Sequence, residues 1–247
     1  MKLTVFFTPL GVNPQDVSGR PVLVIDVLRA TTTMVTALAH GARAVLPVAS
    51  GDEALRLANN LHREDVLLAG ERGYRMIEGF AMGNSPREVT GDKVRGMTLI
   101  MSTSNGTPAV LAADPGRPVL VGAAVNFSAA AAAAKAAFEE TGDLVILCAG
   151  QDRRFALEDA YTAGRFAREI LPPRLPRSFE VNDAAIAAKE LVRYYGDRWN
   201  RAFAASSSAR KLRELGLEHD VLAATEVDRY DIVPHYSERQ IRVDARG

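Results

Sequence analysis

Residues 22–33 read Val-Leu-Val-Ile-Asp-Val-Leu-Arg-Ala-Thr-Thr-Thr, an apolar run that reaches an aspartate and passes into a hydroxyl-rich turn. The run over 22–27 predicts a buried strand, and residues 34–40 predict a helix that Gly41 closes. The same order recurs along the chain. Further strands are expected at 44–48, 66–69, 97–101, 119–121 and 144–147, and further helices at 52–62, 107–113, 128–140 and 157–170. Such Val/Ile/Leu strands separated by helices predict an α/β fold with a mostly parallel central sheet, covered on both faces.

A proline-rich segment at 172–176 interrupts this alternation. Beyond it, residues 183–195 and about 200–215 predict helices, and the serines at 206–208 are expected to interrupt or cap the second of them. The tail over 230–243 is expected to add one or two strands, and Pro234 should make any such strand an edge or terminal one. We therefore expect a single α/β domain over residues 1–247, with a helical C-terminal portion from about residue 177.

The composition argues against a nucleic-acid-binding or membrane protein. The 30 basic residues balance the 30 acidic residues, so no overall positive charge favours nucleic acid or an anionic membrane. The single cysteine, Cys148, excludes an intramolecular disulfide and a cysteine-based zinc site. No apolar stretch approaches the length of a membrane span. We expect a cytoplasmic protein, for which a homo-oligomer is a possible state.

Three polar loops carry most of the chemistry, at residues 26–33, 70–73 and 102–107. Each follows a predicted strand, so all three should lie at the carboxyl edge of the parallel sheet, where α/β proteins bind their ligands. Together they supply carboxylates, guanidinium groups, hydroxyls and backbone N–H groups. This mixture suits a divalent metal and an oxyanion substrate.

Asp26 lies near the carboxyl end of the first of these strands. In phosphotransfer sites such an aspartate binds Mg²⁺ or attacks phosphorus, and it must be ionised for either role. A carboxylate that only caps the next turn is the alternative. Thr31, Thr32 and Thr33 would offer hydroxyls and a helix N-terminus as an anion pocket, or else only cap the helix. Arg29 beside them favours the functional interpretation.

Glu71 and Arg72 follow the strand at 66–69 and lie between two glycines. The carboxylate would bind the metal and the guanidinium an anion, unless the two form a surface ion pair. A helix is expected to begin at Ser85-Pro86-Arg87-Glu88, where capping explains Ser85 but leaves Asn84 as a candidate site residue.

The loop Ser102–Thr107 is similar in chemistry to a phosphate-cradling turn, although it lacks the lysine of a Walker motif. Gly106 permits a close approach to the backbone, and Ser104, Asn105 and Thr107 supply polar groups around it. An Asn-Gly pair alone is a common turn. Its position after a strand favours a role in binding.

Glu158 and Asp159 open the predicted helix 157–170. Adjacent carboxylates at a helix N-terminus often only complement the helix dipole. Here they are also placed to complete a metal site, and Mg²⁺ usually takes one or two protein carboxylates. The four histidines show no zinc spacing.

Several motifs resemble those of the 2-phosphosulfolactate phosphatase family, in the same order, over about residues 3 to 170. They are 24–33, 70–73, 79–80 with 83–86, 104–107, and 148–150 with 157–159. The resemblance implies a three-layer α/β/α fold and an Mg²⁺-dependent phosphatase that hydrolyses 2-phospho-3-sulfolactate to 3-sulfolactate and phosphate. In methanogens that step belongs to coenzyme M biosynthesis. Two positions depart from the family pattern: Tyr74, where a second glycine often follows Gly73, and Ala81, where aspartate is expected.

On this interpretation the partner is a small anionic phosphorylated substrate, bound with Mg²⁺. The expected catalytic residues are Asp26, Arg29 and Glu71. The expected substrate-binding residues are Arg29, Thr31, Thr32, Thr33, Arg72, Asn84, Ser104, Asn105, Gly106 and Thr107. The expected metal ligands are Asp26, Glu71, Glu158 and Asp159. A non-catalytic anion-binding or regulatory protein on the same fold is the alternative, and the missing Walker lysine disfavours a nucleotide-dependent phosphotransferase.

Overall fold

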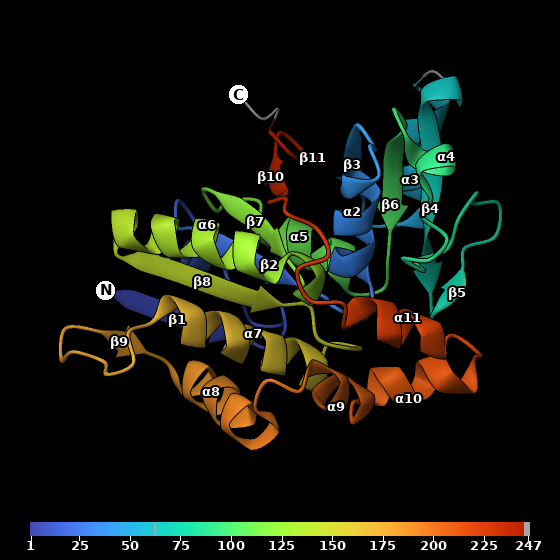
Figure 1. Cartoon of the computed structure of the whole chain (residues 1–247). Helices are drawn as coiled ribbons and strands as arrows, with labels where there is room; N and C mark the ends of the chain where they lie inside the picture. The colour runs from blue at the N-terminus through green and yellow to red at the C-terminus, as the bar shows by residue number, and fades with distance from the viewer. Residues whose placement is uncertain (62, 245–247) are drawn as a thin grey trace.

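The computed structural model describes residues 1–61 and 63–244, and in this part of the chain the strands form one large sheet flanked by helices (Figure 1). The strands are β1 (Lys2–Phe6), β2 (Val22–Ile25), β3 (Ala44–Pro47), β4 (Val66–Arg72), β5 (Arg75–Met76), β6 (Thr98–Ser102), β7 (Val119–Gly122), β8 (Asp143–Cys148), β9 (Glu180–Val181), β10 (His235–Ser237) and β11 (Gln240–Arg242). The α-helices are α1 (Pro14–Val17), α2 (Ala30–Ala39), α3 (Gly51–Asn59), α4 (Gly91–Val94), α5 (Gly106–Ala112), α6 (Phe127–Thr141), α7 (Leu157–Ile170), α8 (Asp183–Tyr195), α9 (Trp199–Ala204), α10 (Ser207–Glu214) and α11 (Glu218–Ala224). The predicted α/β/α fold with a mostly parallel central sheet is confirmed.

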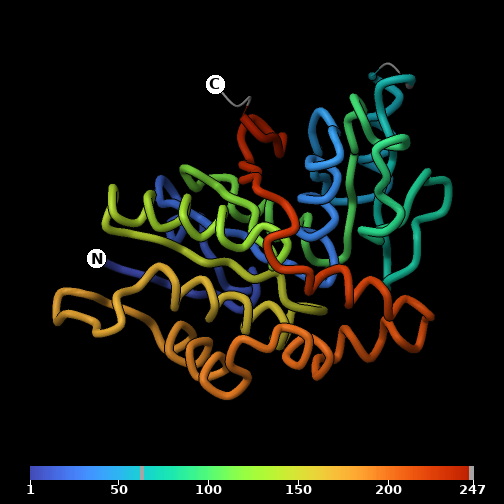
Figure 2. Tube along the Cα trace, in the orientation of Figure 1, coloured from blue at the N-terminus to red at the C-terminus, as the bar shows by residue number. Residues whose placement is uncertain are grey.

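The sheet consists of two parallel blocks joined by the C-terminal hairpin, in the order β5-β4-β6-β3-β11-β10-β7-β2-β8-β1-β9. β7, β2, β8, β1 and β9 pair in parallel, as do β3, β6 and β4. The hairpin β10–β11 pairs antiparallel with β7 on one side and with β3 on the other. In Figure 2 this red segment passes between the two blocks.

Of the two expectations for a tail strand after Pro234, an edge position is wrong, because β10 and β11 lie inside the sheet, whereas they are the last strands along the described chain. Pro234 is tolerated since it stands just before β10, so its missing N–H removes no bond of that strand. Its carbonyl instead accepts a hydrogen bond from the Val121 N–H at 2.9 Å.

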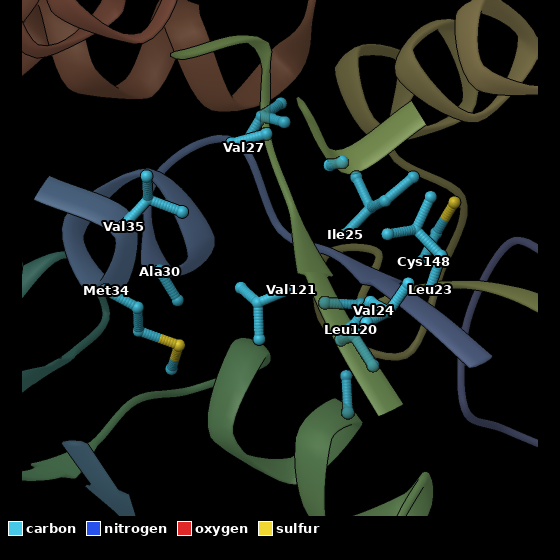
Figure 3. Close-up of a cluster of buried hydrophobic side chains, with 14 of the residues drawn as sticks. Leu23, Val24, Ile25, Val27, Ala30, Met34, Val35, Leu120, Val121 and Cys148 are labelled. Carbon is cyan, nitrogen blue, oxygen red and sulfur yellow. The ribbon is translucent and has the colours of Figure 1, made fainter. Parts of the chain in front are cut away.

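Short apolar side chains of the central strands form the core. Residues 22–25 of β2 are fully buried between β7 and β8, and Figure 3 shows Leu23, Val24 and Ile25 in the same cluster as Val121 and Cys148. Helices α6 and α7 pack on this block, whereas α3 packs against β4 and β6. Burial raises the pKa of the Cys148 thiol well above its usual value, in keeping with a packing role for this residue.

Three element boundaries near the polar loops differ from those predicted. Helix α2 begins at Ala30 rather than at residue 34, so the three threonines at 31–33 lie in its first turn. Strand β4 continues to Arg72 before the chain turns back as β5. The helix expected at Ser85 is wrong, because residues 86–88 form a turn and the next helix is α4.

The C-terminal portion is mainly helical from α8 to α11, and in Figure 1 α8 lies below β1 and β8 while α10 and α11 lie below the block of β3, β6 and β4. The helix expected over 200–215 is divided in two, and Ser206 caps α10 by accepting a hydrogen bond from the Ala209 N–H at 3.1 Å. Helix α3 ends at Asn59, and His62, where the predicted helix ended, lies outside the described residues. Among the described helices, none is long and apolar enough to cross a membrane.

Ile241 of β11 is fully buried and pairs with Val45 of β3, so it fastens the hairpin to one block. The substitution Ile241→Ala should lower the free energy of unfolding by about 2–5 kcal/mol, because it leaves a cavity in the core. The matched control is Ile186→Ala in α8, where the residue is 50% exposed and a change within about 0.5 kcal/mol is expected. Urea denaturation measures both variants, and equal losses would contradict the buried position of the hairpin.

Candidate functional site

A pocket lies where the loops after β2, β4, β6 and β8 meet the start of helix α10. Many of the predicted site residues line it: Asp26, Arg29, Glu71, Asn84, Ser104, Asn105, Glu158 and Asp159. Its volume is about 30 Å³, and on the same measure one water molecule needs roughly 10–15 Å³. In this conformation the pocket therefore has room for an ion or a few waters.

Asp26 directly follows β2, and the hydroxyl of Thr31 fixes its main chain. The Asp26 N–H donates to Thr31 Oγ1 at 3.1 Å, and Thr31 Oγ1 donates to the Asp26 carbonyl at 2.9 Å. The carboxylate accepts a bond from the Ala30 N–H at 3.3 Å and lies over Gly106, where a Cβ atom would stand 2.5 Å from Asp26 Oδ2. Gly106 is therefore required because the aspartate approaches its backbone so closely.

Burial sets the electrostatics of Asp26. The pKa of this carboxyl is raised from 3.8 to about 7, chiefly by burial; the Ala30 hydrogen bond and the Arg29 charge lower it, and the negative charges of Glu71 and Glu158 add to the rise. The pKa of Asp159 is raised well above its usual value, again chiefly by burial. Buried carboxylates that repel one another favour the binding of a cation, because the cation would stabilise their ionised forms.

Asp159 joins two loops to the first turn of α7. Its Oδ1 accepts a hydrogen bond from the Val27 N–H at 2.9 Å, and its Oδ2 accepts one from the Gly150 N–H at 3.1 Å. Both oxygens therefore already serve the backbone. This side chain holds the loops after β2 and β8 together.

Glu71 performs the same task on the other block. Its Oε1 accepts from the Ser104 N–H at 2.7 Å, while its Oε2 accepts from the Tyr74 N–H at 2.7 Å and from Ser104 Oγ at 3.2 Å. The β4–β5 turn is thus fastened to the loop after β6. Tyr74 has a φ of 70°, a conformation that glycine adopts freely, which explains why glycine is the expected residue at this position.

Arg29 lines the pocket, but its charge is already paired. One guanidinium nitrogen donates to Asp220 Oδ2 at 2.6 Å, and the other terminal nitrogen donates to the Tyr74 carbonyl at 3.1 Å. The two charged side chains are 3% and 2% exposed. Asp220 comes from α11 and was not among the predicted site residues.

The remaining predicted residues, Thr31, Thr32, Thr33, Arg72, Gly106 and Thr107, do not line the pocket. The threonine hydroxyls bond to the main chain instead. Thr32 Oγ1 donates to the Val27 carbonyl at 2.9 Å, and Thr33 Oγ1 donates to the Asn84 carbonyl at 3.0 Å. These residues support the loops that form the pocket.

Arg72 and Thr107 make similar supporting contacts. Arg72 donates to Ser102 Oγ at 2.8 Å, and Thr107 Oγ1 accepts from the Thr103 N–H at 2.9 Å. The aspartate that the family pattern suggests at position 81 would also lie elsewhere, because Ala81 is exposed and outside the lining. Its absence removes no group from this pocket.

Several lining residues were not among the individually predicted site residues, although the first two lie in predicted loops: Leu28, Gly73, Tyr74, Gly150, Gln151, Asp152 and Ser208. Those at 150–152 follow β8, and their place after a strand is a signal that could have included them. Ser208 carries no such signal, because α10 reaches the pocket from the distant C-terminal portion. Ser208 Oγ donates to Gln151 Oε1 at 3.0 Å, which connects α10 to the loop after β8.

Asp26, Glu158 and Asn84 are suited to hold a cation. Among the described residues, Glu158 Oε2 and Asn84 Oδ1 are buried oxygens without a hydrogen-bond partner. Carboxylate and amide oxygens are the protein ligands of Mg²⁺. Within residues 1–61 and 63–244, no group of three His, Cys, Asp or Glu side chains is arranged to hold an ion by itself. The donors fit a Mg²⁺ ion that keeps one or two carboxylates and completes its shell with water or substrate oxygens.

Comparisons with known proteins agree with one another. Residues 6–239 match the family model of 2-phosphosulpholactate phosphatase. A protein of Caldanaerobacter subterraneus subsp. tengcongensis, named probable 2-phosphosulfolactate phosphatase, is 36% identical over 95% of each chain. Proteins of the same name from Symbiobacterium thermophilum and Deinococcus radiodurans are 37% and 42% identical, over 92% and 86% of this chain and 95% and 85% of their own.

The contact between Gly106 and Asp26 yields a test of the pocket. In Gly106→Ala the new methyl group would stand 2.3 Å from the Ala30 Cβ and 2.5 Å from Asp26 Oδ2, so overpacking should cost about 1–3 kcal/mol of stability. The control is Gly51→Ala, where the nearest atom is 3.5 Å away and the loss should be negligible. Thermal unfolding compares the two, and a Gly106→Ala protein as stable as the control would contradict the close packing of Asp26.

Proposed function

Because the chain belongs to the 2-phosphosulfolactate phosphatase family, we propose that it hydrolyses 2-phospho-3-sulfolactate, or a similar small anionic phosphate monoester, with Mg²⁺ as cofactor. The products would be 3-sulfolactate and phosphate. The reaction is that of a phosphoric monoester hydrolase, the class to which the family and the relatives' names belong.

The charge of the pocket is the observation that carries this proposal. Among the described residues that line it, five are carboxylates and one is a guanidinium, and that guanidinium is paired with Asp220. Such a pocket repels an anionic substrate unless a cation is bound first. A polyanionic monoester and a divalent cation therefore complement this site together, whereas the anion alone does not.

Asp26, Glu158 and the amide oxygen of Asn84 are the side chains that we assign to the cation. When bound, Mg²⁺ would polarise a phosphoryl oxygen and neutralise charge that develops on phosphate transfer. Glu71 and Asp159 have a different task, since their oxygens already accept backbone hydrogen bonds. They keep the loops in place around the substrate.

Arg29 is the cationic side chain that we assign to a substrate oxyanion. A guanidinium has five N–H donors. The bonds to Asp220 and to the Tyr74 carbonyl use two of them, so other donors remain for a substrate oxyanion. Arg29, Asp26 and Glu158 are buried, so charge interactions inside the pocket are stronger than at the surface. In hydrolysis, water then attacks phosphorus, the bond from phosphorus to the C2 oxygen breaks, and that oxygen takes up a proton.

The proposal is tested by phosphate release from purified protein that has been stripped of metal with a chelator. With 2-phospho-3-sulfolactate, release should begin on addition of Mg²⁺ and stop on addition of excess chelator. A panel of other small phosphate monoesters would identify related substrates. If no ester is hydrolysed in the presence of Mg²⁺, the non-catalytic anion-binding alternative replaces the phosphatase.

Asp26→Asn keeps the size of the side chain and removes its charge. Turnover should fall by about two orders of magnitude or more, which corresponds to at least ~2.7 kcal/mol of lost transition-state stabilisation. Excess Mg²⁺ should restore part of the lost turnover, because a cation site with weakened affinity is occupied at a higher Mg²⁺ concentration. The control is Asp92→Asn, an exposed position in α4.

Steady-state kinetics over a range of Mg²⁺ concentrations gives the result. If Asp26→Asn turned over substrate at the wild-type rate, the assignment of Asp26 to the cation would be wrong, and Asp26 would only cap the following turn. A hydroxylamine-sensitive phosphate group on the wild-type protein, with no rescue of the variant by Mg²⁺, would instead identify Asp26 as the nucleophile.

A further inference from the structure

The C-terminal helix α11 places a buried carboxylate beside a site whose lining, apart from Ser208 of α10, comes from residues between 26 and 159. Asp220 Oδ2 accepts a hydrogen bond from Arg29 at 2.6 Å, and Asp220 Oδ1 accepts one from Ser85 Oγ at 2.6 Å. The Asp220 side chain is 2% exposed. Asp220 itself does not line the pocket, so it acts on the site through its two partners.

The first partner is the guanidinium of Arg29. A buried arginine needs a counter-ion, since removing one member of a buried ion pair leaves an uncompensated charge. Asp220 on one side and the Tyr74 carbonyl on the other hold the planar guanidinium at two points. These contacts fix its orientation toward the pocket that it lines.

The second partner, Ser85, is adjacent to Asn84. The Asn84 carbonyl accepts the Thr33 hydroxyl bond at 3.0 Å, which fixes one side of this residue. The Ser85 bond to Asp220 fixes the other side. Asn84 Oδ1, which among the described atoms has no hydrogen-bond partner, is thereby held as part of the pocket wall.

We propose that Asp220 is a positioning residue for anion binding, which holds Arg29 and the Asn84–Ser85 wall in place from α11. The inference rests on the proposed function, because it assumes that the pocket binds a phosphate group. It also gives the C-terminal helical portion a direct role in the site, beyond covering the sheet.

Inorganic phosphate is the probe, and isothermal titration calorimetry in the presence of Mg²⁺ measures its binding without any turnover. Asp220→Asn should weaken phosphate binding at least tenfold and raise KM more than it lowers kcat. The matched control is Asp143→Asn, which breaks another arginine–aspartate pair, with Arg20, at 2.5 Å. Asp143 stands at the start of β8, away from the pocket, so that variant should bind phosphate as the wild type does.

A double-mutant cycle separates positioning from a general loss of structure. In an Arg29→Gln background, Asp220→Asn should change phosphate affinity less than twofold, because the arginine partner is already gone and the amide oxygen of the variant can still accept the Ser85 hydroxyl. Should Asp220→Asn fail to fold, Ser85→Ala replaces it, since that variant keeps the ion pair and should still weaken phosphate binding several-fold.

Wild-type phosphate affinity in Asp220→Asn, or in Ser85→Ala where that variant is used, would overturn the inference, as would equal, additive losses in the cycle. A wild-type protein that binds no phosphate would also overturn it. A wild-type protein that binds phosphate with Mg²⁺ but hydrolyses no ester would refute the proposed function alone, and the cycle would still decide the role of Asp220.

Discussion

Backbone hydrogen bonds to buried carboxylates are the interaction on which the pocket depends. Asp159 connects the loops after β2 and β8, and Glu71 connects the β4–β5 turn to the loop after β6. A buried carboxylate is costly unless such bonds compensate its desolvation. Each carboxylate therefore assembles the loops of one parallel block, and the bonds from Arg29 to the Tyr74 carbonyl and from Thr33 to the Asn84 carbonyl join the two halves. The cost of burial is thus coupled to the assembly of the site.

The carboxylates around the pocket therefore have two kinds of environment. Glu71 and Asp159 are satisfied by the main chain, whereas Glu158 keeps a buried oxygen that has no partner among the described residues. Burial raises the pKa values of Asp26 and Glu158, and repulsion by Glu71 and Glu158 adds to the rise at Asp26. A divalent cation would relieve both effects, and it would allow an anionic phosphate to approach a pocket whose own charge is negative.

The sequence predicts the parallel sheet well because Val/Ile/Leu runs and helices alternate locally. It also predicts which side chains meet at the pocket when they directly follow a strand, as Asp26 does. It fails where partners are remote: nothing local indicates that α11 supplies Asp220 or that β10 and β11 enter the sheet. The Ser85 pattern predicted a helix cap, but the Ser85 hydroxyl bonds to Asp220, 135 residues away. The threonines at 31–33 could bind an anion or cap the helix as far as the sequence goes, because residue type alone does not reveal that their hydroxyls donate to main-chain carbonyls.

The central claim is that Asp26 and Glu158 hold the cation while Glu71 and Asp159 hold the loops. Anomalous diffraction from crystals soaked in Mn²⁺, a substitute for Mg²⁺, tests this most directly. The expected result is one strong peak within coordinating distance of Asp26 and Glu158, with the backbone bonds of Glu71 and Asp159 unchanged. A cation coordinated by Glu71 or Asp159 instead, or a pocket without any peak at saturating Mn²⁺, would contradict the claim.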